Sequence, residues 1–146
     1  MSKLLQAVVG ELSKLPGVGR RTALRLAIHL LRMDRESVAA MTESIDRFRN
    51  EVKYCTRCNN LSDEEVCPIC ADPERDHTTI CVVEQVVDVL SIENTRQYRG
   101  LSHVLGGVIS PMQGISPSDL KIDLLFERIE AAGVRGGIRA LPSPWG

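Results

Sequence analysis

Hydrophobic residues in the first third of the chain recur at intervals of three and four, the spacing of one face of an α-helix. This pattern predicts a short helix over residues 3–13 and a second helix from about Arg20 to Met33. Asp34 is a good N-cap for a third helix, because its carboxylate can accept from backbone N–H groups of the first turn. The apolar stripe of the third helix is expected to be Val38, Met41, Ile45, Phe48 and Val52. The apolar face of the second helix is expected to be Ala23, Leu26, Ala27, Leu30 and Leu31.

From residue 78 onward the helical spacing gives way to β-branched runs. The run from Thr78 ends in the acid Glu84 and predicts a buried parallel strand. The alternation of strands and helices that follows predicts a small α/β unit, so the whole chain is expected to have an α+β fold. The later elements are expected to be a helix over 86–94, a strand over 101–105, a helix from Ser116-Pro117-x-Asp119 to about residue 132, and a strand over 138–141.

Four cysteines precede this unit as two pairs, Cys55-x2-Cys58 and Cys67-x2-Cys70. Each pair forms a tight knuckle that aims two sulfurs at one point, and the spacer between the pairs is long enough to fold back. Zn²⁺ suits four thiolates, because it binds them tetrahedrally and has no redox chemistry of its own. Four ligands leave no position for water or substrate, so we expect one structural zinc ion. Two disulfides or a redox C-x-x-C motif are the alternative.

The charge is unevenly distributed along the 146 residues. Residues 1–35 carry seven basic and two acidic side chains, a net charge of +5, and the remainder has a net charge of −6. A basic end of this kind indicates either a binding surface for a polyanion or a solvated helix face. No apolar run is long enough to span a bilayer, and the N-terminus lacks the features of a signal peptide. We therefore expect no membrane association and a cytoplasmic location.

The segment between the first two helices has the pattern of a helix-hairpin-helix motif. Gly17 and Gly19 allow a sharp turn that exposes backbone N–H groups at the start of the second helix, an anion site sized for a phosphate. Ala23 and Ala27 allow the two helices to pack closely. A plain helical hairpin without a ligand is the alternative, but the basic balance favours contact with a nucleic-acid backbone, and the 3% aromatic content argues against base stacking. The candidate DNA-binding residues are Lys14, Gly17, Gly19, Arg20, Arg21 and Arg25.

Glu84 ends the first predicted strand, at the edge where sheets of this kind place ligands. A metal-dependent phosphoryl-transfer site needs further acids, because a single carboxylate holds Mg²⁺ poorly. Asp88 lies one turn into the next helix, and no Asp-x-Asp pair follows it. We therefore expect a protein that is not an enzyme. His29 is expected to pack among apolar residues, whereas His103 lies in the second predicted strand and its role is left open by the sequence.

The order of these motifs resembles that of a known family. The segment Leu15-Pro16-Gly17-Val18-Gly19 is followed by the four cysteines, then by Cys70-Ala71-Asp72-Pro73-x-Arg75-Asp76, Ile80-Cys81-Val82-Val83-Glu84 and Tyr98-Arg99-Gly100-Leu101-x-His103-Val104-Leu105-Gly106-Gly107. In this order, over about residues 3–132, the sequence closely resembles the bacterial recombination mediator proteins of the RecR family. Each motif is weak alone, but the set is highly specific.

The resemblance implies three domains: a helix-hairpin-helix with a linking helix over residues 1–53, a four-cysteine zinc finger over 54–73 and a partial Toprim domain over 74–146. Toprim is a small α/β fold shared with topoisomerases and primases. The resemblance also implies a non-enzymatic mediator of DNA repair that, with the partners RecO and RecF, helps load RecA on gapped or single-stranded DNA, and that assembles as a homo-oligomer. It maps the DNA-contacting positions of the hairpin onto Arg21 and Arg25, and the Toprim glutamate, an acidic or partner site, onto Glu84. A Toprim-type metal-dependent nuclease or nucleotidyl-transferring enzyme is the alternative.

The chain departs from the family pattern near its C-terminus. The family continues from the strand near residue 141 into an acidic loop and further strands, whereas this sequence continues as Pro142-Ser143-Pro144-Trp145-Gly146. Arg135-Gly136-Gly137 also replaces a hydrophobic segment that would lead into the strand. We therefore expect a truncated or frameshifted product that lacks the later Toprim strands and the C-terminal assembly segment, with a partly disordered α/β half.

Overall fold

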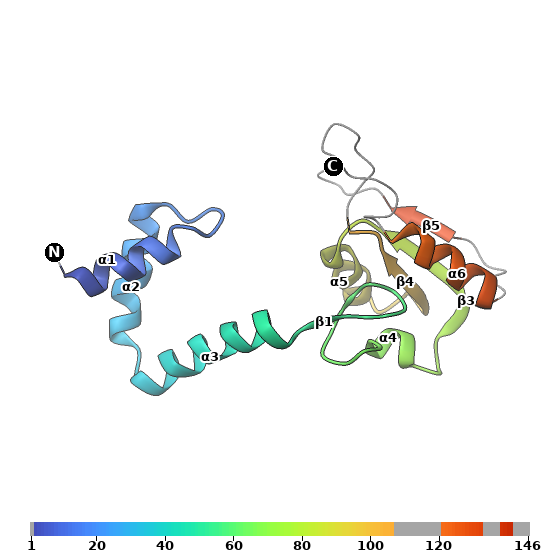
Figure 1. Ribbon diagram of the computed structural model, residues 1–146, viewed down its shortest axis with the longest axis horizontal. Helices are drawn as coiled ribbons and strands as arrows, with labels where there is room; N and C mark the ends of the chain where they lie inside the picture. The colour runs from blue at the N-terminus through green and yellow to red at the C-terminus, as the bar shows by residue number, and fades with distance from the viewer. Residues whose placement is uncertain (1, 107–120, 133–137, 142–146) are drawn as a thin grey trace. The chain divides into compact units, whose positions relative to one another are not determined.

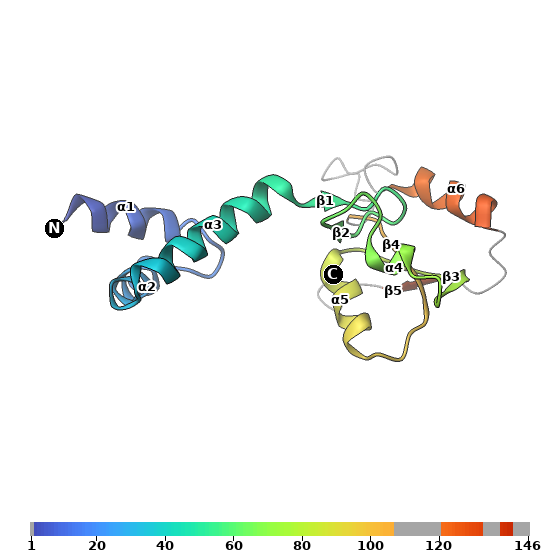
Figure 2. The ribbon, with the colours of Figure 1, turned by 90° about the horizontal axis from the view of Figure 1, so that it is seen from below.

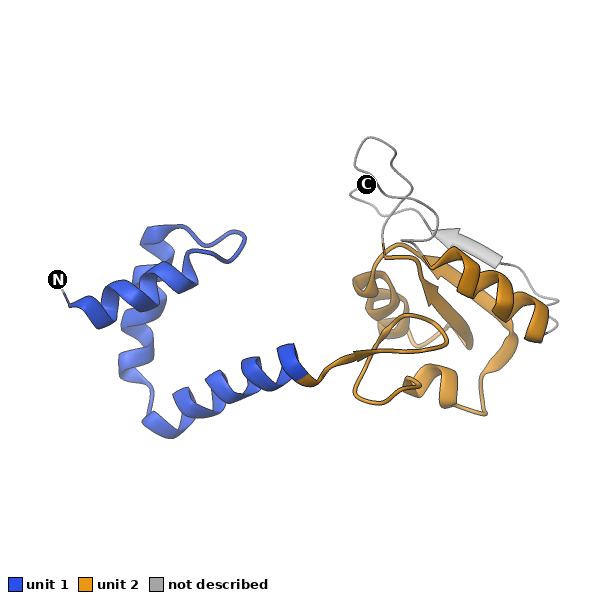
Figure 3. Cartoon of the chain, viewed as in Figure 1, with its two compact units in different colours: residues 1–50 blue, residues 51–146 orange. Residues whose placement is uncertain are grey.

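The computed structural model describes residues 2–106, 121–132 and 138–141. The chain divides into two compact units, residues 1–50 and residues 51–146 (Figure 3). The first unit is helical, and the second holds the four cysteines and both small sheets, so the expected α+β fold class is confirmed. The helix start expected at residues 116–119 lies outside the described residues.

Three helices make up the first unit, and their caps follow from the sequence. They are α1 (Lys3–Leu12), α2 (Arg20–Arg32) and α3 (Arg35–Glu51). The Ser2 hydroxyl accepts from the Leu5 N–H at 3.2 Å and caps α1. The Asp34 carboxylate accepts from the Ser37 N–H at 3.3 Å and from the Ser37 hydroxyl at 2.6 Å, which confirms the predicted cap of α3. The predicted bounds of α1 and α2 hold to within one residue.

Small residues let α1 and α2 pack closely, as the sequence predicted. Val9, Ala23 and Ala27 are buried together, with Leu5, Leu12 and Val18 packed against them. Only part of the apolar face predicted on α2 is buried, because Leu26 is 42% exposed and Leu31 is 78% exposed. The reason is geometric: α1 covers only the strip of α2 that carries the two alanines.

The apolar stripe predicted on α3 is present in the helix but is not buried. None of the α3 side chains is buried, and Met41, Ile45 and Phe48 are all exposed. In α3 the apolar residues therefore recur with helical spacing without being buried. The helical spacing correctly predicted the helix, but the described part of the chain does not cover the stripe.

The cysteine segment forms a short hairpin followed by one helical turn. Strands β1 (Lys53–Tyr54) and β2 (Leu61–Ser62) pair in antiparallel fashion, with Tyr54 opposite Leu61. The turn α4 (Pro68–Ala71) has Pro at its first position, where the missing N–H removes no helical hydrogen bond. This hairpin and turn bring the two cysteine pairs to one place.

A three-stranded parallel sheet forms the rest of the second unit (Figure 1, Figure 2). Its strands are β3 (Asp76–Val83), β4 (Gly100–Val104) and β5 (Ile138–Leu141), in the order β4-β3-β5, and its helices are α5 (Val86–Asn94) and α6 (Ile122–Ala132). The register places Ile80 beside Leu101 on one side and beside Ile138 on the other. The prediction of alternating strands and helices is confirmed, although β3 begins two residues earlier than predicted.

The two helices cover opposite faces of the sheet, because successive side chains of a strand point to opposite sides. On one face, Val89 of α5 packs with Cys81, Val83 and Val104. On the other face, Leu125 of α6 packs with Ile80, Val82 and Leu101. Among the described residues, no helix combines the length and the apolar composition that crossing a bilayer requires.

Candidate metal centre and nucleic-acid interface

The four cysteines predicted as metal ligands come together in the second unit. Their sulfur atoms all lie within 4.8 Å of one another, and each side chain is buried. The first pair lies in the turn after β1. In the second pair, Cys67 is the N-cap of α4 and Cys70 lies within that helix. The cysteines contributing to this group are Cys55, Cys58, Cys67 and Cys70.

Backbone N–H groups point at the sulfur atoms, as they do around negatively charged thiolates. The Cys67 N–H lies 3.3 Å from the Cys55 sulfur, and the Cys70 N–H lies 3.5 Å from the Cys67 sulfur. The sulfurs of Cys58 and Cys67 are 3.5 Å apart. Such N–H donors stabilise a thiolate, but they cannot neutralise the negative charge of four thiolates.

The electrostatics of the cluster call for a cation. Hydrogen bonding with Cys67 and Cys70, together with burial, holds the pKa of the Cys58 thiol well above its usual value. Hydrogen bonds from Cys58 and Cys70 hold the pKa of the Cys67 thiol well below its usual value. Without a metal, one thiolate is therefore stabilised at the expense of its neighbours. A divalent ion removes this conflict, and four sulfurs at this separation fit the tetrahedral geometry of structural zinc.

The first cysteine knuckle is joined directly to the end of strand β4. The Val104 N–H donates to the Cys58 carbonyl oxygen at 2.8 Å. The side-chain amide of Asn59 donates to the Val104 carbonyl oxygen at 2.9 Å. Asn59 has a φ of +65°, a left-handed conformation that Asn tolerates better than most residues. Sequence reasoning did not identify Asn59, since its partner lies 45 residues away.

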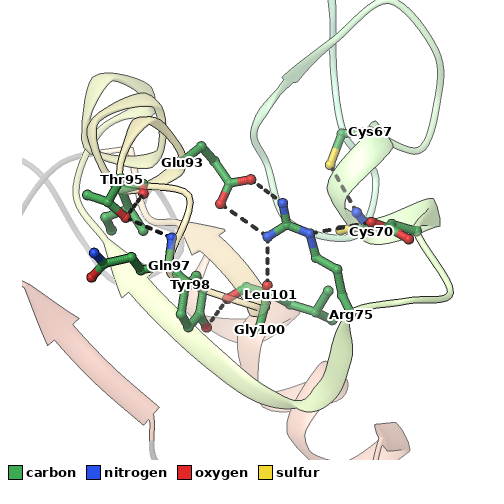
Figure 4. Close-up of polar contacts among 11 residues, drawn as sticks. Cys67, Cys70, Arg75, Glu93, Thr95, Gln97, Tyr98, Gly100 and Leu101 are labelled. Atoms are coloured by element: carbon green, nitrogen blue, oxygen red, sulfur yellow. Dashed lines mark hydrogen bonds and ion pairs between the residues drawn. The ribbon is translucent and has the colours of Figure 1, made fainter.

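A second connection runs from the exit of the finger to α5 and β4 through Arg75 (Figure 4). Its guanidinium forms an ion pair with Glu93 and donates to the Gly100 carbonyl oxygen at 3.0 Å. Asp72 lies 3.8 Å from the Arg75 Nε. Hydrogen bonding with Glu93 raises the pKa of Arg75. The Asp72-Pro73-x-Arg75 segment was part of the family resemblance in the sequence, but the sequence did not predict a contact for Arg75.

The hairpin between α1 and α2 has the exposed backbone that the sequence predicted. Gly17 has a φ of +80°, which favours glycine, and Gly19 is the N-cap of α2 without a side-chain hydrogen bond. The first N–H groups of α2 therefore lack the partner that a Ser or Asp cap would supply. These groups and the helix dipole leave a place for an anion.

The basic residues around this hairpin differ in how they are paired. Arg20, Arg21 and Arg25 are exposed, and no ion pair holds them within the part of the chain that the structure describes. Lys14 forms an ion pair with Glu11 at 3.0 Å, so its charge is offset within the protein. The three arginines consequently remain the stronger candidates for DNA contact, and Lys14 is the weaker one.

Glu84 follows β3 immediately and is half-buried at the carboxyl edge of the sheet. Its carbonyl oxygen accepts from the Gly106 N–H at 2.8 Å. Asp88 caps α5, where its carboxylate accepts from the Gln85 N–H at 3.0 Å. Across residues 2–106, 121–132 and 138–141, the cysteines are the one group arranged to hold a metal ion. Glu84 therefore lacks a cluster of acids among the described side chains.

His103, whose role the sequence left open, is a structural link between β4 and α6. It is fully buried, and its Nδ1 accepts from the Arg128 guanidinium at 2.9 Å, because arginine can only donate. Its Nε2–H then donates to the Lys121 carbonyl oxygen at 3.1 Å. Burial, assisted by the Arg128 charge, lowers the pKa of His103 to about 4. The ring is therefore neutral at physiological pH.

Exposed turn glycines, arginines without an ion pair among the described residues, a four-sulfur cluster and a parallel sheet are typical of a zinc-containing protein of the nucleic-acid-binding class. Comparisons with known families agree with this class. A family model described as RecR helix-hairpin-helix matches residues 5–48, one described as the RecR four-cysteine zinc finger domain matches 52–72, and one described as Toprim domain matches 78–138.

Curated relatives identify the family. The chain is 56% identical to Recombination protein RecR of Bacteroides thetaiotaomicron over 140 residues, which cover 96% of the chain and 68% of that protein. It is 56% identical to Recombination protein RecR of Phocaeicola vulgatus over 142 residues (97% and 69%), and 49% identical to that of Flavobacterium johnsoniae over 142 residues (97% and 69%). The chain belongs to the RecR family of recombination proteins.

Family membership confirms the resemblance found in the sequence and supports the expected structural zinc ion. It also makes DNA the expected ligand of the helix-hairpin-helix. These three relatives are named as recombination proteins, not for a catalysed reaction. The domain boundaries after residues 53 and 73, and the individual DNA-contacting residues, stay predictions.

Proposed function

We propose that this chain is a non-enzymatic mediator of recombinational DNA repair that binds the backbone of single-stranded and gapped DNA through its hairpin. The observation that carries the proposal is the glycine-capped start of α2 beside three exposed arginines, Arg20, Arg21 and Arg25, which form no ion pair with any described residue. Phosphate is the ligand that this arrangement suits, because backbone N–H groups and guanidinium groups both donate to its oxygens.

The two glycines of the hairpin support the proposal in different ways. Gly17 is required by its positive φ. Gly19 is not, because its φ is −81° and an added Cβ would meet no atom within 4 Å. Glycine is an acceptable N-cap, but a Ser, Asp or Asn there would also supply a side-chain acceptor to the first turn of α2. Glycine instead leaves those N–H groups open and lets a ligand backbone approach the first turn of α2 closely, which is consistent with the proposal.

Recognition of this kind depends on charge and not on base identity. Contacts to phosphate position a protein on DNA but carry no sequence information. Affinity should accordingly fall steeply with salt and vary little between sequences. A single hairpin offers few contacts, so binding gains strength when several copies present their hairpins together. The exposed apolar stripe of α3 supports such assembly into a homo-oligomer.

The family relationship extends the proposal to partners. We propose that the chain acts in the cytoplasm with RecO and RecF, and that together they help load RecA onto gapped or single-stranded DNA. Glu84, at the carboxyl edge of the sheet, is proposed as an acidic contact for a partner and not as a catalytic residue.

The test is a titration of single-stranded and gapped DNA with the full chain at several salt concentrations, with and without RecO. Arg21→Ala and Arg25→Ala should each weaken binding on unrelated sequences, and each lost phosphate contact should reduce the slope of log affinity against log salt by about 0.7 to 0.9. Binding by the double variant that equals the parent, with the same slope, would remove the hairpin as the DNA site. RecO should strengthen binding of the parent to gapped DNA.

A further inference from the structure

The basic face of α2 continues well beyond the hairpin. Arg21, Arg25, His29 and Arg32 follow one another at intervals of four, four and three, which places them along one side of the helix. All four side chains are exposed. The buried Ala23 and Ala27 lie on the side that faces α1. The expectation that His29 packs among apolar residues was therefore wrong, and its ring is available to solvent.

The segment that carries these side chains has no acidic residue of its own. No acidic residue occurs between Leu12 and Met33. Within the described ranges, no ion pair holds Arg21, Arg25 or Arg32. Arg25, His29 and Arg32 also border one open hollow with a volume of about 560 Å³. Its other lining residues are the apolar Leu24, Leu26 and Ile28. The stripe is thus an exposed row of three arginines and one histidine along α2.

Two physical explanations compete for the far end of this stripe. Cations in the last turn of a helix interact favourably with its dipole, and His29 and Arg32 lie in the last turn of α2. That effect does not account for the alignment with Arg21 and Arg25, which lie outside the last turn and repel each other as like charges four residues apart. A bound polyanion would neutralise these charges and so remove the repulsion. Each phosphate contact also favours binding, because it releases condensed counterions.

We propose that His29 and Arg32 extend the DNA site along α2, so that the phosphate backbone follows the helix from the hairpin toward its C-terminal end. This inference rests on the proposed DNA-binding function. The distance from Arg21 to Arg32 is roughly 16 Å along the helix axis, at about 1.5 Å per residue. One strand of B-form DNA presents a phosphate about every 3.4 Å of axis, so the stripe passes several phosphates.

The experiment compares variants of the full chain in which one basic or imidazole side chain is replaced by glutamine. Arg32→Gln and His29→Gln test the extension, Arg25→Gln tests the hairpin site, and Arg49→Gln on α3 is the matched control, because Arg49 is also exposed and basic but lies off the stripe. Binding to dT oligonucleotides of increasing length and to a gapped duplex is measured between about 50 and 200 mM salt. Melting temperature is recorded for every variant.

We expect Arg32→Gln to lower the salt slope by about 0.7 to 0.9 and to remove the gain in affinity that longer oligonucleotides give the parent. His29→Gln should weaken binding less, and Arg49→Gln should leave the slope unchanged. The extension is overturned if Arg32→Gln lowers only the melting temperature, or if Arg49→Gln weakens binding equally. In those outcomes a loss of affinity in Arg25→Gln keeps the hairpin function standing, whereas parental binding by Arg25→Gln contradicts the proposed function itself.

Discussion

The side-chain amide of Asn59 donates to the backbone carbonyl oxygen of Val104 at 2.9 Å. The Val104 N–H donates in turn to the carbonyl oxygen of Cys58 at 2.8 Å. The end of β4 is therefore held by the loop that carries the first two metal ligands. Because a structural metal ion couples to the folding of the segment that supplies its ligands, we expect the sheet and the zinc site to be coupled through these hydrogen bonds.

Removal of zinc should loosen the end of β4 before it affects the helical hairpin. A chelator leaves the Cys55–Cys58 loop without its cross-link, so the Val104 N–H loses a fixed acceptor and exchanges faster. Hydrogen exchange of residues 100–106, with and without zinc, measures this effect. Residues 3–32, which lie in the other unit, serve as the internal control. Unchanged protection of Val104 after full metal removal would contradict the coupling.

Substitution of Asn59 should separate the backbone role of this residue from its hydrogen bond. Asn59→Gly keeps the positive φ and loses the amide, whereas Asn59→Ala loses the amide and adds backbone strain. We expect Asn59→Ala to lower the free energy of unfolding by about 1 kcal/mol more than Asn59→Gly. Denaturant unfolding of the zinc-loaded protein is the measurement. Equal stability of the two variants would show that the left-handed conformation carries no strain.

His103 should make stability depend on pH below neutrality. Its pKa is about 4 in the folded chain, below the value of about 6.5 for an unfolded histidine, so the unfolded state binds more protons between these values. The contribution is complete above about pH 6.5 and is lost as pH falls toward 4, up to about 3 kcal/mol. His103→Gln removes the titrating group, and its stability should fall less between pH 7 and pH 5. Parallel curves of unfolding free energy against pH for the parent and the variant would contradict the prediction. Loss of zinc at low pH is expected in both proteins, so the comparison between them isolates the contribution of His103.

Periodicity and motif spacing predicted much of this structure in advance. The bounds of α5 and β5 match the prediction, and the spacing of the cysteines was sufficient to predict their cluster. The start of β3 was missed because Asp76 and His77 are polar and lack the β-branched signal. The exposure of α3 was missed because helical spacing reports a face but not what covers it.

The remaining features depend on contacts between distant parts of the chain. Asn59, Arg75 and His103 each join segments separated by 18 residues or more, and no local pattern reports such pairs. His103 was visible only as a polar residue inside an apolar strand. A titratable side chain in that position requires buried partners, and that requirement was the signal available in the sequence.

Glu84 should not support cleavage of DNA. A metal-dependent phosphoryl-transfer site needs several acids around one ion, and Asp88, the nearest candidate in sequence, already caps α5 through the Gln85 N–H. We therefore expect no Mg²⁺-dependent nicking of supercoiled or gapped DNA by the parent, and no difference between the parent and Glu84→Gln. The assay is incubation of purified chain with plasmid DNA and Mg²⁺, followed by gel analysis. Cleavage that survives purification and disappears in Glu84→Gln would instead establish a Toprim-type enzyme, while a loss of partner binding alone in this variant would agree with the role proposed for Glu84.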